Sequence, residues 1–469
     1  MDAVKDTTLP AECPKKQVSK KRKNLLIMAT TYFLGTFNDN FFKQATLLAA
    51  VSFNLKGIQG LATIIFTLPY MLVSAPGGWF ADHFPKKKVV VAVKVLELIA
   101  VCIGGLGFLL LKEGDSLFSA SWMLILIMLA VMGMHTSIFS PALIGTIPEL
   151  YPESHVPKAN GIVRLVSTLG ILSGIALAGF VLETTFDFHF LDNIKGRLEA
   201  SREYITVAGV IVFIALVGVF ASLGLPHYHY DKKDKLRSPF PWLGPIQTWK
   251  DLIEIKKDPL LHLAVWGNTY FWFLGSFIVL AINEIGANQL GLSKSVTSGL
   301  IVGQMVGIGV GAMLISRKSL ISIKPWYRFV IPSLSAINFF MLGIACIPLL
   351  PIEVFGSLSL QAIMLALLLL SLGVCGGVFL IPIETFIQLR PAANSKGKTI
   401  AASNFASFIG ILLSGPLYCL FALFNYPPTV YFLPLFLMTV VFIAWLKIKL
   451  RQYEQNSIID DAEILYENI

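Results

Sequence analysis

Charged side chains interrupt the apolar stretches of this 469-residue chain at only a few places, and two pairs of them are spaced for ion pairing. Asp39 and Lys43 are four residues apart with the acid first, which is the better order for an ion pair on one face of a helix. Lys94 and Glu97 form a second close pair at a spacing of three. Protonation of Asp39, or competition from a charged ligand head group, would open the first pair. We therefore expect Asp39 and Lys43 to form a site for a substrate or a coupling ion, with a static ion pair as the alternative.

Polar neighbours and two further charged residues extend this candidate site. Asn38 and Asn40 flank Asp39. Arg164 lies well inside another apolar stretch and needs a partner there. Its planar guanidinium can bind two oxygens of a substrate phosphate, or it can join an interhelical salt bridge or reach back to the membrane surface. Functional and structural roles are both open for the pair of Lys94 and Glu97. Glu384, at the end of a later apolar stretch, is a candidate gate residue.

The composition places these residues in a lipid bilayer. Hydrophobic residues make up 55% of the chain and charged residues 14%, which would leave a soluble fold with apolar surface in water. About 20 apolar residues in a helix cross about 30 Å of hydrocarbon. Twelve stretches reach that length, which predicts an all-α integral membrane protein with twelve transmembrane helices. They span residues 24–51, 58–81, 89–112, 121–146, 158–182, 204–225, 262–283, 295–316, 325–349, 356–384, 397–423 and 428–449.

The chain is built from two copies of one unit. Residues 32–37 (YFLGTF) return as 272–277 (WFLGSF), and the same offset of 240 residues carries Gly170 onto Gly410. Six predicted helices fall in each copy, but the charged cluster is not duplicated, because Val279 stands at the position equivalent to Asp39. The predicted order is a basic N-terminal tail (1–23), a six-helix bundle (24–225), a linker (226–261), a second six-helix bundle (262–449) and a C-terminal tail (450–469).

Basic residues predict the orientation of the chain in the membrane. Loops rich in Lys and Arg stay on the cytoplasmic side, and most of the 37 basic residues fall on the side of the N-terminal tail and the linker. Both termini are therefore expected in the cytoplasm, and the first 23 residues do not resemble a cleaved signal. The net charge of +9 then reflects topology and contact with anionic membrane lipids, so we expect no nucleic-acid partner. Residues 248–254 of the linker predict a short amphipathic helix along the membrane surface.

Enzyme signatures are missing from the sequence. Its polar segments are too short for a catalytic domain, and its five cysteines are scattered without the spacing of metal ligands. The glycine-rich stretch 307–311 lies inside an apolar helix with no strand before it, which favours close helix packing over nucleotide binding. We therefore expect no catalytic residues, no metal and no cofactor.

A chain of twelve helices in two six-helix repeats resembles the major facilitator superfamily. Residues 78–88 (GWFADHFPKKK), between the second and third predicted helices, look like the signature loop of that superfamily. The resemblance implies the major facilitator fold and a cytoplasmic gate, whose residues here are Asp82, Lys86 and Lys87. Two positions depart from the usual pattern, because His83 stands where Arg is common and Pro85 where Gly is common.

Four further stretches narrow the resemblance to the bacterial lysophospholipid transporters. They are residues 37–44 (FNDNFFKQ), 140–142 (SPA), 158–161 (KANG) and 376–382 (GGVFLIP). The chain is especially similar to the transporter domain that some bacteria fuse to an acyltransferase and an acyl-carrier-protein ligase. Members of this branch flip lysophospholipids, chiefly lysophosphatidylethanolamine, inward across the inner membrane for reacylation, so the resemblance implies a separate lysolipid acyltransferase as a partner. Two family cations are replaced, by Leu143 and Val279.

These observations predict a secondary transporter that moves lysophospholipid across the bacterial inner membrane by alternating access. Few intramembrane charges and 34 phenylalanines suit an amphiphile, which needs a charged niche for its head group and an apolar path for its chain. Two alternatives stay open: transport of another amphiphile or drug, and a membrane receptor or scaffold that transports nothing. The coupling ion, the direction of transport and the head-group selectivity stay open as well.

Overall fold

The computed structural model describes residues 15–55, 57–147, 156–184, 202–226, 239–316, 326–351, 353–355, 358–391 and 396–467. Within these ranges the protein is nearly all helical. The long helices are α1 (Lys15–Ser52), α2 (Ile58–His83), α3 (Lys86–Leu109), α4 (Ala120–Ile144), α6 (Val156–Val181), α8 (Arg202–Leu223), α10 (Pro259–Glu284), α11 (Lys294–Ser316), α12 (Tyr327–Ala345), α13 (Leu360–Leu389), α14 (Lys396–Leu423) and α15 (Phe432–Glu467).

Shorter elements connect these helices. They are α9 (Gly244–Glu254), η3 (Ile255–Lys257), η4 (Ile285–Gln289), η6 (Ile347–Leu349), η7 (Pro428–Tyr431) and the strands β1 (Val354–Phe355) and β2 (Leu358–Ser359). The two strands pair antiparallel, with Val354 opposite Ser359. Cys13 and the charged linker run 232–237, together with most of the predicted basic tail, lie outside the described residues.

Apolar composition accounts for eleven of the long helices. Within the described ranges, eleven helices are long and apolar enough to span a membrane, and α1 is not among them. The run Asn38-Asp39-Asn40, followed by Lys43 and Gln44, makes α1 less apolar than the others. α1 nevertheless packs among α2, α6 and α8. The protein is therefore a multi-pass membrane protein with the predicted twelve long helices, the first of which is unusually polar.

Capping side chains and a glycine mark several helix ends. Ser119, Asp258 and Ser359 precede α4, α10 and α13, and the side chain of each accepts a hydrogen bond from a backbone N–H in the first helical turn. Gly57 directly precedes α2 with a φ of 81°, a left-handed conformation that suits glycine. α1 begins before its predicted span 24–51, and α15 continues beyond 428–449, because backbone hydrogen bonding in a helix does not require lipid around it.

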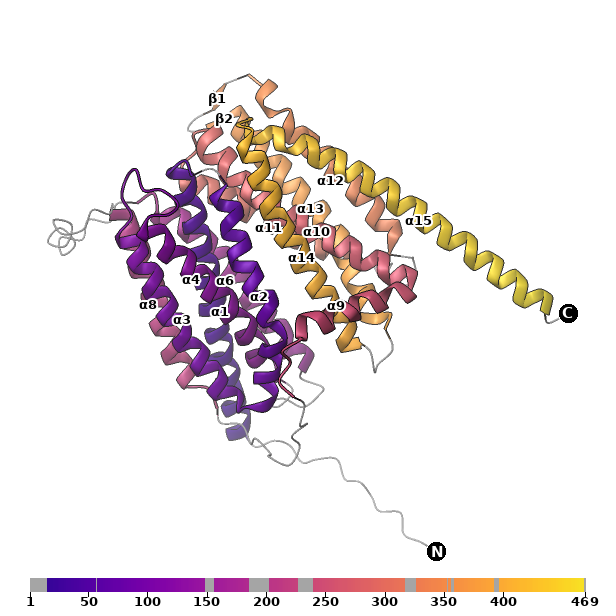
Figure 1. The fold of residues 1–469 in the computed structure, drawn as a ribbon, viewed down its shortest axis with the longest axis horizontal. Coiled ribbons are helices and arrows are strands. Elements are labelled where there is room, and N and C mark those ends of the chain that lie inside the picture. Colours follow the sequence, from indigo (N-terminus) through magenta and orange to yellow (C-terminus); the bar gives the residue numbers. More distant parts are fainter. Residues whose placement is uncertain are drawn as a thin grey trace, which may run out of the picture.

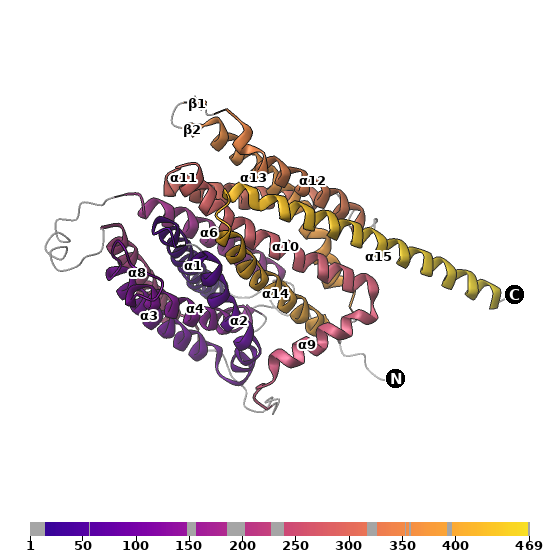
Figure 2. The same ribbon diagram turned by 45° about the horizontal axis from the view of Figure 1, so that its top comes forward.

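Two groups of helices divide the molecule. Helices α1, α2, α3, α4, α6 and α8 pack together as the first half, and α10 to α15 form the second half. Figure 1 shows the first half, in indigo and magenta, beside the orange and yellow helices of the second half, and Figure 2 shows the same division after rotation. We call the boundary between them the seam. It is formed chiefly by α2 against α14 and by α6 against α11, and each half has its own apolar core.

Equivalent glycines show the duplication in three dimensions. Gly170 of α6 faces the backbone of α1 at Phe33, and Gly410 of α14 faces the backbone of α10 at Phe273. A Cβ atom at Gly170 would collide with the Thr36 hydroxyl of α1, and one at Gly410 with the Thr269 carbonyl oxygen of α10, so the small residue allows both helix pairs to approach closely. The two glycines thus close equivalent helix pairs, α1 with α6 in the first half and α10 with α14 in the second. The predicted pair of six-helix repeats is thus confirmed. The predicted packing role of the glycine-rich stretch 307–311 is confirmed too, because a Cβ atom at Gly307 or Gly311 would collide with the backbone of α13.

The linker helix α9 bridges the two halves on one side of the molecule. The described ranges hold twelve long helices, an even number, so we infer that α1 begins and α15 ends on the same side, which we call the tail side. α9 lies there and contacts both α2 and α14, as Figure 1 shows. Gly244 lies against Ala75 of α2, while Lys398 of α14 binds Asp251 and Glu254 of α9 at 3.0 and 2.9 Å. We call the opposite side of the bundle the far side.

α9 is amphipathic, as the sequence predicts. Its apolar side chains Ile246, Trp249 and Ile253 are about half exposed and follow one another at helical spacing. The acidic residues that bind Lys398 lie on the same short helix. The polar side chains of α9 therefore join the two halves, while its apolar side chains stay exposed, as expected for a helix that lies along a membrane surface.

Candidate functional site

Three helices of the first half meet at the buried carboxylate of Glu97. Lys94 forms the ion pair that its spacing predicts, with 2.5 Å between its Nζ and Glu97 Oε2. Asn38 of α1 donates a hydrogen bond of 2.9 Å to Oε1. His135 of α4 lies with its Nε2 3.2 Å from Oε2. All four side chains are fully buried, so this network has no contact with solvent.

The surroundings of Lys94 are shaped to hold its ammonium. Its Nζ lies 4.6 Å from the centre of the Phe139 ring, a distance at which a cation interacts with a ring face. A Cβ atom at Gly35 would lie 3.0 Å from Nζ, and one at Gly218 would lie 3.4 Å away. The network borders neither of the two large cavities described below. The sequence left both a functional and a structural role open for Lys94 and Glu97, and this geometry favours the structural one.

Asp39 lies beside this network but does not form the direct ion pair with Lys43 that the spacing predicts. Only 6% of Asp39 is exposed, and its Oδ2 accepts a hydrogen bond of 3.0 Å from Thr136 of α4. Its Oδ1 has no hydrogen-bond partner. Lys43 extends away and places its Nζ 4.4 Å from the centre of the Phe66 ring. The prediction is wrong because a spacing of four only permits a contact, and each side chain finds a different partner on a neighbouring helix.

Lys43 reaches a cavity of about 320 Å³ between the two halves. It is the only charged residue among the described residues that line this central cavity. Most of the wall is apolar and aromatic, with Phe66, Phe271, Trp272 and Phe408 among its residues. The polar lining residues are Asn40, Thr63, Thr67, Gln44, Ser276 and Gln304. The Gln304 side chain is buried and its Oε1 has no hydrogen-bond partner, so it can accept a hydrogen bond from a bound molecule.

On the far side of this cavity, amide side chains join the two halves. Gln44 of α1 donates to Asn283 Oδ1 of α10 at 2.8 Å and to Ser298 Oγ of α11 at 3.1 Å. Asn283 donates to Gln59 Oε1 of α2 at 3.3 Å. Gln59 in turn donates to the Tyr418 hydroxyl of α14 at 2.8 Å. We call this continuous chain of hydrogen bonds the seam chain, and it closes the central cavity toward the far side.

Charged contacts reinforce the closure at the far-side surface. Lys294 of α11 binds Glu203 of α8 at 3.1 Å and donates to the Leu182 carbonyl at 3.2 Å. The Glu183 carboxylate accepts a bond of 3.1 Å from the backbone N–H of Ser295. Hydrogen bonds from Ser295 lower the pKa of Glu183 below its ordinary value. This contact between the halves is therefore present at neutral pH and is lost only as the pH falls through that lowered pKa.

On the tail side, the described residues include one pair of opposite charges from α6 and α13. Arg164 of α6 is exposed, and Glu384 of α13, in the other half, is half-buried. The two side chains interact electrostatically across the seam without forming an ion pair. Of the predicted gate residues, Lys86 donates a bond of 2.6 Å to the Gly145 carbonyl within the first half, and Asp82 is exposed. Arg164 and Glu384 are thus within electrostatic range of each other across the seam, while the role of the signature loop as a gate stays a prediction.

Several residues of the site were not singled out in the sequence. His135 is one, although a histidine in the middle of the apolar stretch 121–146 was an available signal. Gln44, Gln59 and Asn283 are others. Each is an amide in or next to an apolar helix, which a bilayer tolerates only when the amide has a partner. The partners come from the other half of the chain, so the sequence could not show which residues they are.

Comparison with known proteins agrees with this architecture. The family model described as Major Facilitator Superfamily matches residues 25–415. The "Lysophospholipid transporter LplT" of Enterobacter sp. (strain 638) is 24% identical over 418 residues, which cover 85% of this chain and 88% of the relative. The protein of the same name from Pectobacterium carotovorum subsp. carotovorum (strain PC1) is 25% identical over 421 residues, covering 87% and 88%.

Solved structures share the fold at low sequence identity. A bacterial homolog of the human lysosomal transporter Spinster, in an inward-facing and unoccupied conformation, superposes with a TM-score of 0.63 at 15% identity, over 93% of this chain and 96% of that one. A D-xylose-proton symporter gives a TM-score of 0.66 at 13% identity, over 90% and 97%.

Proposed function

Because the chain belongs to the Major Facilitator Superfamily, we propose that it is a secondary transporter that moves a lysophospholipid across the bacterial inner membrane by alternating access. The first candidate substrate is lysophosphatidylethanolamine. The relatives named lysophospholipid transporters support this choice, although they share only 24 to 25% identity with the chain. The observation that carries the proposal is the central cavity, whose described wall is mostly apolar and holds one charge, that of Lys43.

The two parts of a lysophospholipid match the two parts of this wall. The phosphate diester carries one negative charge, which the Lys43 ammonium can bind. The single acyl chain can lie against the aromatic residues around Phe271 and Trp272. The unpaired Gln304 Oε1 can accept a hydrogen bond from the ammonium of an ethanolamine head group. Asn40 lines the same cavity and adds a polar contact.

Asp39 is the proposed coupling residue. Its Oδ1 is buried without a partner, so the carboxylate can take up a proton or hold a cation without breaking its bond to Thr136. It lies four residues from Lys43 on α1, and the two charges interact electrostatically. A negatively charged head group bound at Lys43 and a charge change at Asp39 would thus affect each other. Asn38, which precedes Asp39 in the chain, donates a hydrogen bond to Glu97 of the neighbouring network.

Alternating access needs one side closed and the other able to open. The seam chain and the contacts of Lys294 close the far side. On the tail side, Arg164 and Glu384 interact electrostatically, and no ion pair joins them among the described residues. The predicted orientation places the tail side in the cytoplasm, so the state described here is closed to the outside. In this account Arg164 and Glu384 form the inner gate, with Asp82, Lys86 and Lys87 of the signature loop nearby.

Uptake of labelled lysophosphatidylethanolamine into spheroplasts that lack their own lysolipid transporter tests the proposal. We expect uptake above that of an empty vector for the natural protein. Lys43→Met should lower uptake by about tenfold, because one charge-assisted contact to phosphate is lost, while Lys43→Arg should retain most of it. Asp39→Asn should also lower uptake and leave the amount of folded protein unchanged.

Two results would argue against this function. Uptake at the level of the vector, with the protein present in the membrane, would favour another amphiphile or drug as substrate, or a receptor or scaffold that transports nothing. Equal uptake by Lys43→Met and Lys43→Arg would remove Lys43 from phosphate binding. Thr63→Val, which changes the cavity wall without changing its charge, serves as the matched control.

A further inference from the structure

A second cavity of about 480 Å³ opens on the far side of the seam chain. We call it the vestibule. Its lining comes from both halves: from the end of α1, the start of α2, the end of α10, and the region where α14 passes into η7. Gln44 lines the central cavity and Gln59 lines the vestibule, so the seam chain separates the two spaces. A molecule that enters from the far side would reach the vestibule first.

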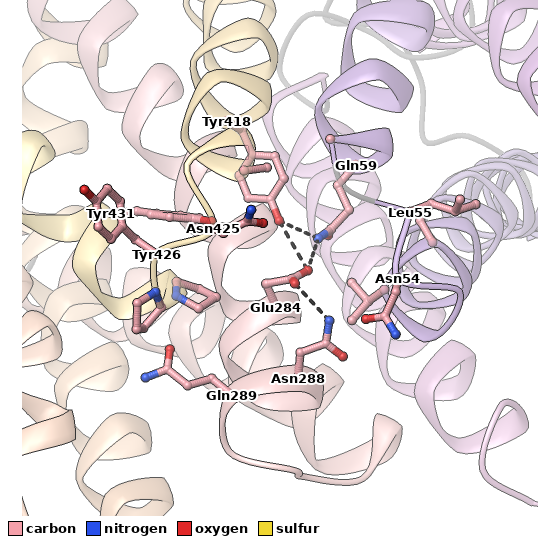
Figure 3. A pocket seen from close by; sticks show the side chains of 16 residues that line it. Asn54, Leu55, Gln59, Glu284, Asn288, Gln289, Tyr418, Asn425, Tyr426 and Tyr431 are labelled. Atoms are coloured by element: carbon pink, nitrogen blue, oxygen red, sulfur yellow. Dashed lines mark hydrogen bonds between the residues drawn. The ribbon is translucent and has the colours of Figure 1, made fainter. Parts of the chain in front are cut away.

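The vestibule contains a carboxylate with neutral partners. Glu284 is the only charged residue among the described residues that line it. Its Oε1 accepts a bond of 2.8 Å from Asn288, and its Oε2 accepts bonds of 3.3 Å from Gln59 and 3.5 Å from the Tyr418 hydroxyl. Figure 3 shows these three donors converging on the carboxylate at the centre of the lining. Among the described residues these partners are all neutral, and none forms an ion pair with Glu284.

Aromatic residues line the same cavity as this carboxylate. Tyr418, Tyr426 and Tyr431 all line the vestibule, and the rings of Tyr418 and Tyr431 meet edge to face at 6.2 Å. A carboxylate next to tyrosine rings is the combination that binds an organic ammonium, because the carboxylate supplies the counter-charge and the ring faces supply cation–π attraction. An inorganic cation would instead favour several oxygen ligands with more than one carboxylate.

We propose that the vestibule binds the ammonium group of a zwitterionic amphiphile as it enters from the far side. This inference rests on the proposed function and specifies the head group. In the part of the chain that the structure describes, the vestibule offers one negative charge, at Glu284, and the central cavity one positive charge, at Lys43. A head group with an ammonium and a phosphate carries the complementary pair. The ammonium would also compete with Gln59 for Glu284 Oε2, and so weaken a hydrogen bond that joins the two halves on the far side.

Binding to the full-length protein in nanodiscs tests this site. The probes are lysophosphatidylethanolamine and lysophosphatidylglycerol with the same acyl chain, since only the first carries an ammonium. We expect the natural protein to bind the ethanolamine lipid about tenfold more tightly than the glycerol lipid. Glu284→Gln should weaken binding of the ethanolamine lipid only, and so remove this preference. Glu353→Gln, at an exposed carboxylate on the same side, should change neither affinity.

Two further variants keep the test informative if Glu284→Gln does not fold. Glu284→Asp keeps the charge and should keep the preference. Tyr426→Leu removes an exposed ring of the wall and should reduce the preference by about threefold. Competition by free ethanolamine separates two sources of the same chemistry. If ethanolamine displaces the lipid, the site takes any small primary ammonium; if it does not, the site requires the lipid that carries it.

The outcomes separate this inference from the proposed function. A preference for the ethanolamine lipid that survives in Glu284→Gln, or no preference in the natural protein, would overturn the vestibule site even if both lipids are transported. A preference that depends on Glu284, in a protein that takes up neither lipid into spheroplasts, would support the site and contradict lysophospholipid transport.

Discussion

Glu97 illustrates at the scale of a residue how one buried charge organises the first half. Its carboxylate holds Lys94, Asn38 and His135 from three helices. We expect Glu97→Gln to lower the free energy of unfolding by about 3 to 5 kcal/mol, because the buried Lys94 ammonium would lose its counter-charge. Thermal unfolding of the purified protein, followed by size-exclusion chromatography, would measure the loss.

Removing both charges shows whether the stability lost in Glu97→Gln comes from the unpaired Lys94 ammonium or from a change in packing. The double variant Lys94→Met with Glu97→Gln leaves no unpaired buried charge, so it should recover a large part of the lost stability. A Glu97→Gln protein as stable as the natural one would show that Lys94 finds another partner or loses its charge. Asp39→Asn should leave stability nearly unchanged, because an asparagine oxygen can still accept the bond from Thr136.

At the scale of an element, helix α2 contributes to closure of the far side through the side-chain amide of one residue, Gln59. Gln59 donates to Tyr418 and Glu284 and accepts from Asn283, all three of them in the other half. Gln59→Leu should raise the fraction of molecules with an open far side by about fivefold for each kcal/mol of hydrogen bonding lost. Cys419 of α14 is a natural reporter, because its Sγ donates to the Gly57 carbonyl at the start of α2 at 3.2 Å.

The measurement is the labelling rate of Cys419 by a membrane-impermeant maleimide, in a protein whose other cysteines are replaced. Gln289→Leu is the matched control. Gln289 donates to Thr429 at 2.9 Å within the second half, so its loss removes an amide without touching the seam chain. Faster labelling in Gln59→Leu alone is the expected result, and equal labelling in the two variants would mean that the seam chain does not hold the halves together.

At the scale of the whole molecule, Arg164 and Glu384 should become an ion pair when the tail side closes. They lie on α6 and α13, one in each half, and already interact electrostatically. Arg164→Glu or Glu384→Arg alone would place like charges across the closing gate, so each should reduce transport by about tenfold, a coupling of about 1.4 kcal/mol. The double exchange Arg164→Glu with Glu384→Arg restores opposite charges and should recover transport.

The exchange also decides between the two roles that the sequence left open for Arg164. Lysophosphatidylethanolamine uptake into spheroplasts is again the measurement. Recovery in the double variant would assign Arg164 to the gate. If the double variant stays as slow as Arg164→Glu, the guanidinium acts on the substrate phosphate rather than on Glu384.

Much of this architecture could be predicted from the sequence. The length of each apolar stretch predicts the helices, the offset of 240 residues predicts the two repeats, and the spacing of Lys94 and Glu97 predicts their ion pair. These properties depend on nearby residues or on repetition along the chain, so no knowledge of the packing is needed. The low hydropathy of α1 was visible in the same way, as a polar run inside an apolar stretch.

Only the tertiary structure decided which partner each polar side chain has. Lys43 lies over Phe66 rather than against Asp39, and Gln59 bonds to residues more than two hundred positions away. Inside a membrane protein a polar group must find a partner, but several are within reach and the facing helices select one. The sequence determined that these groups would be buried and would need partners. The packing of α2 and α14, and of α1 with α10, determined where the cavities and the seam chain lie.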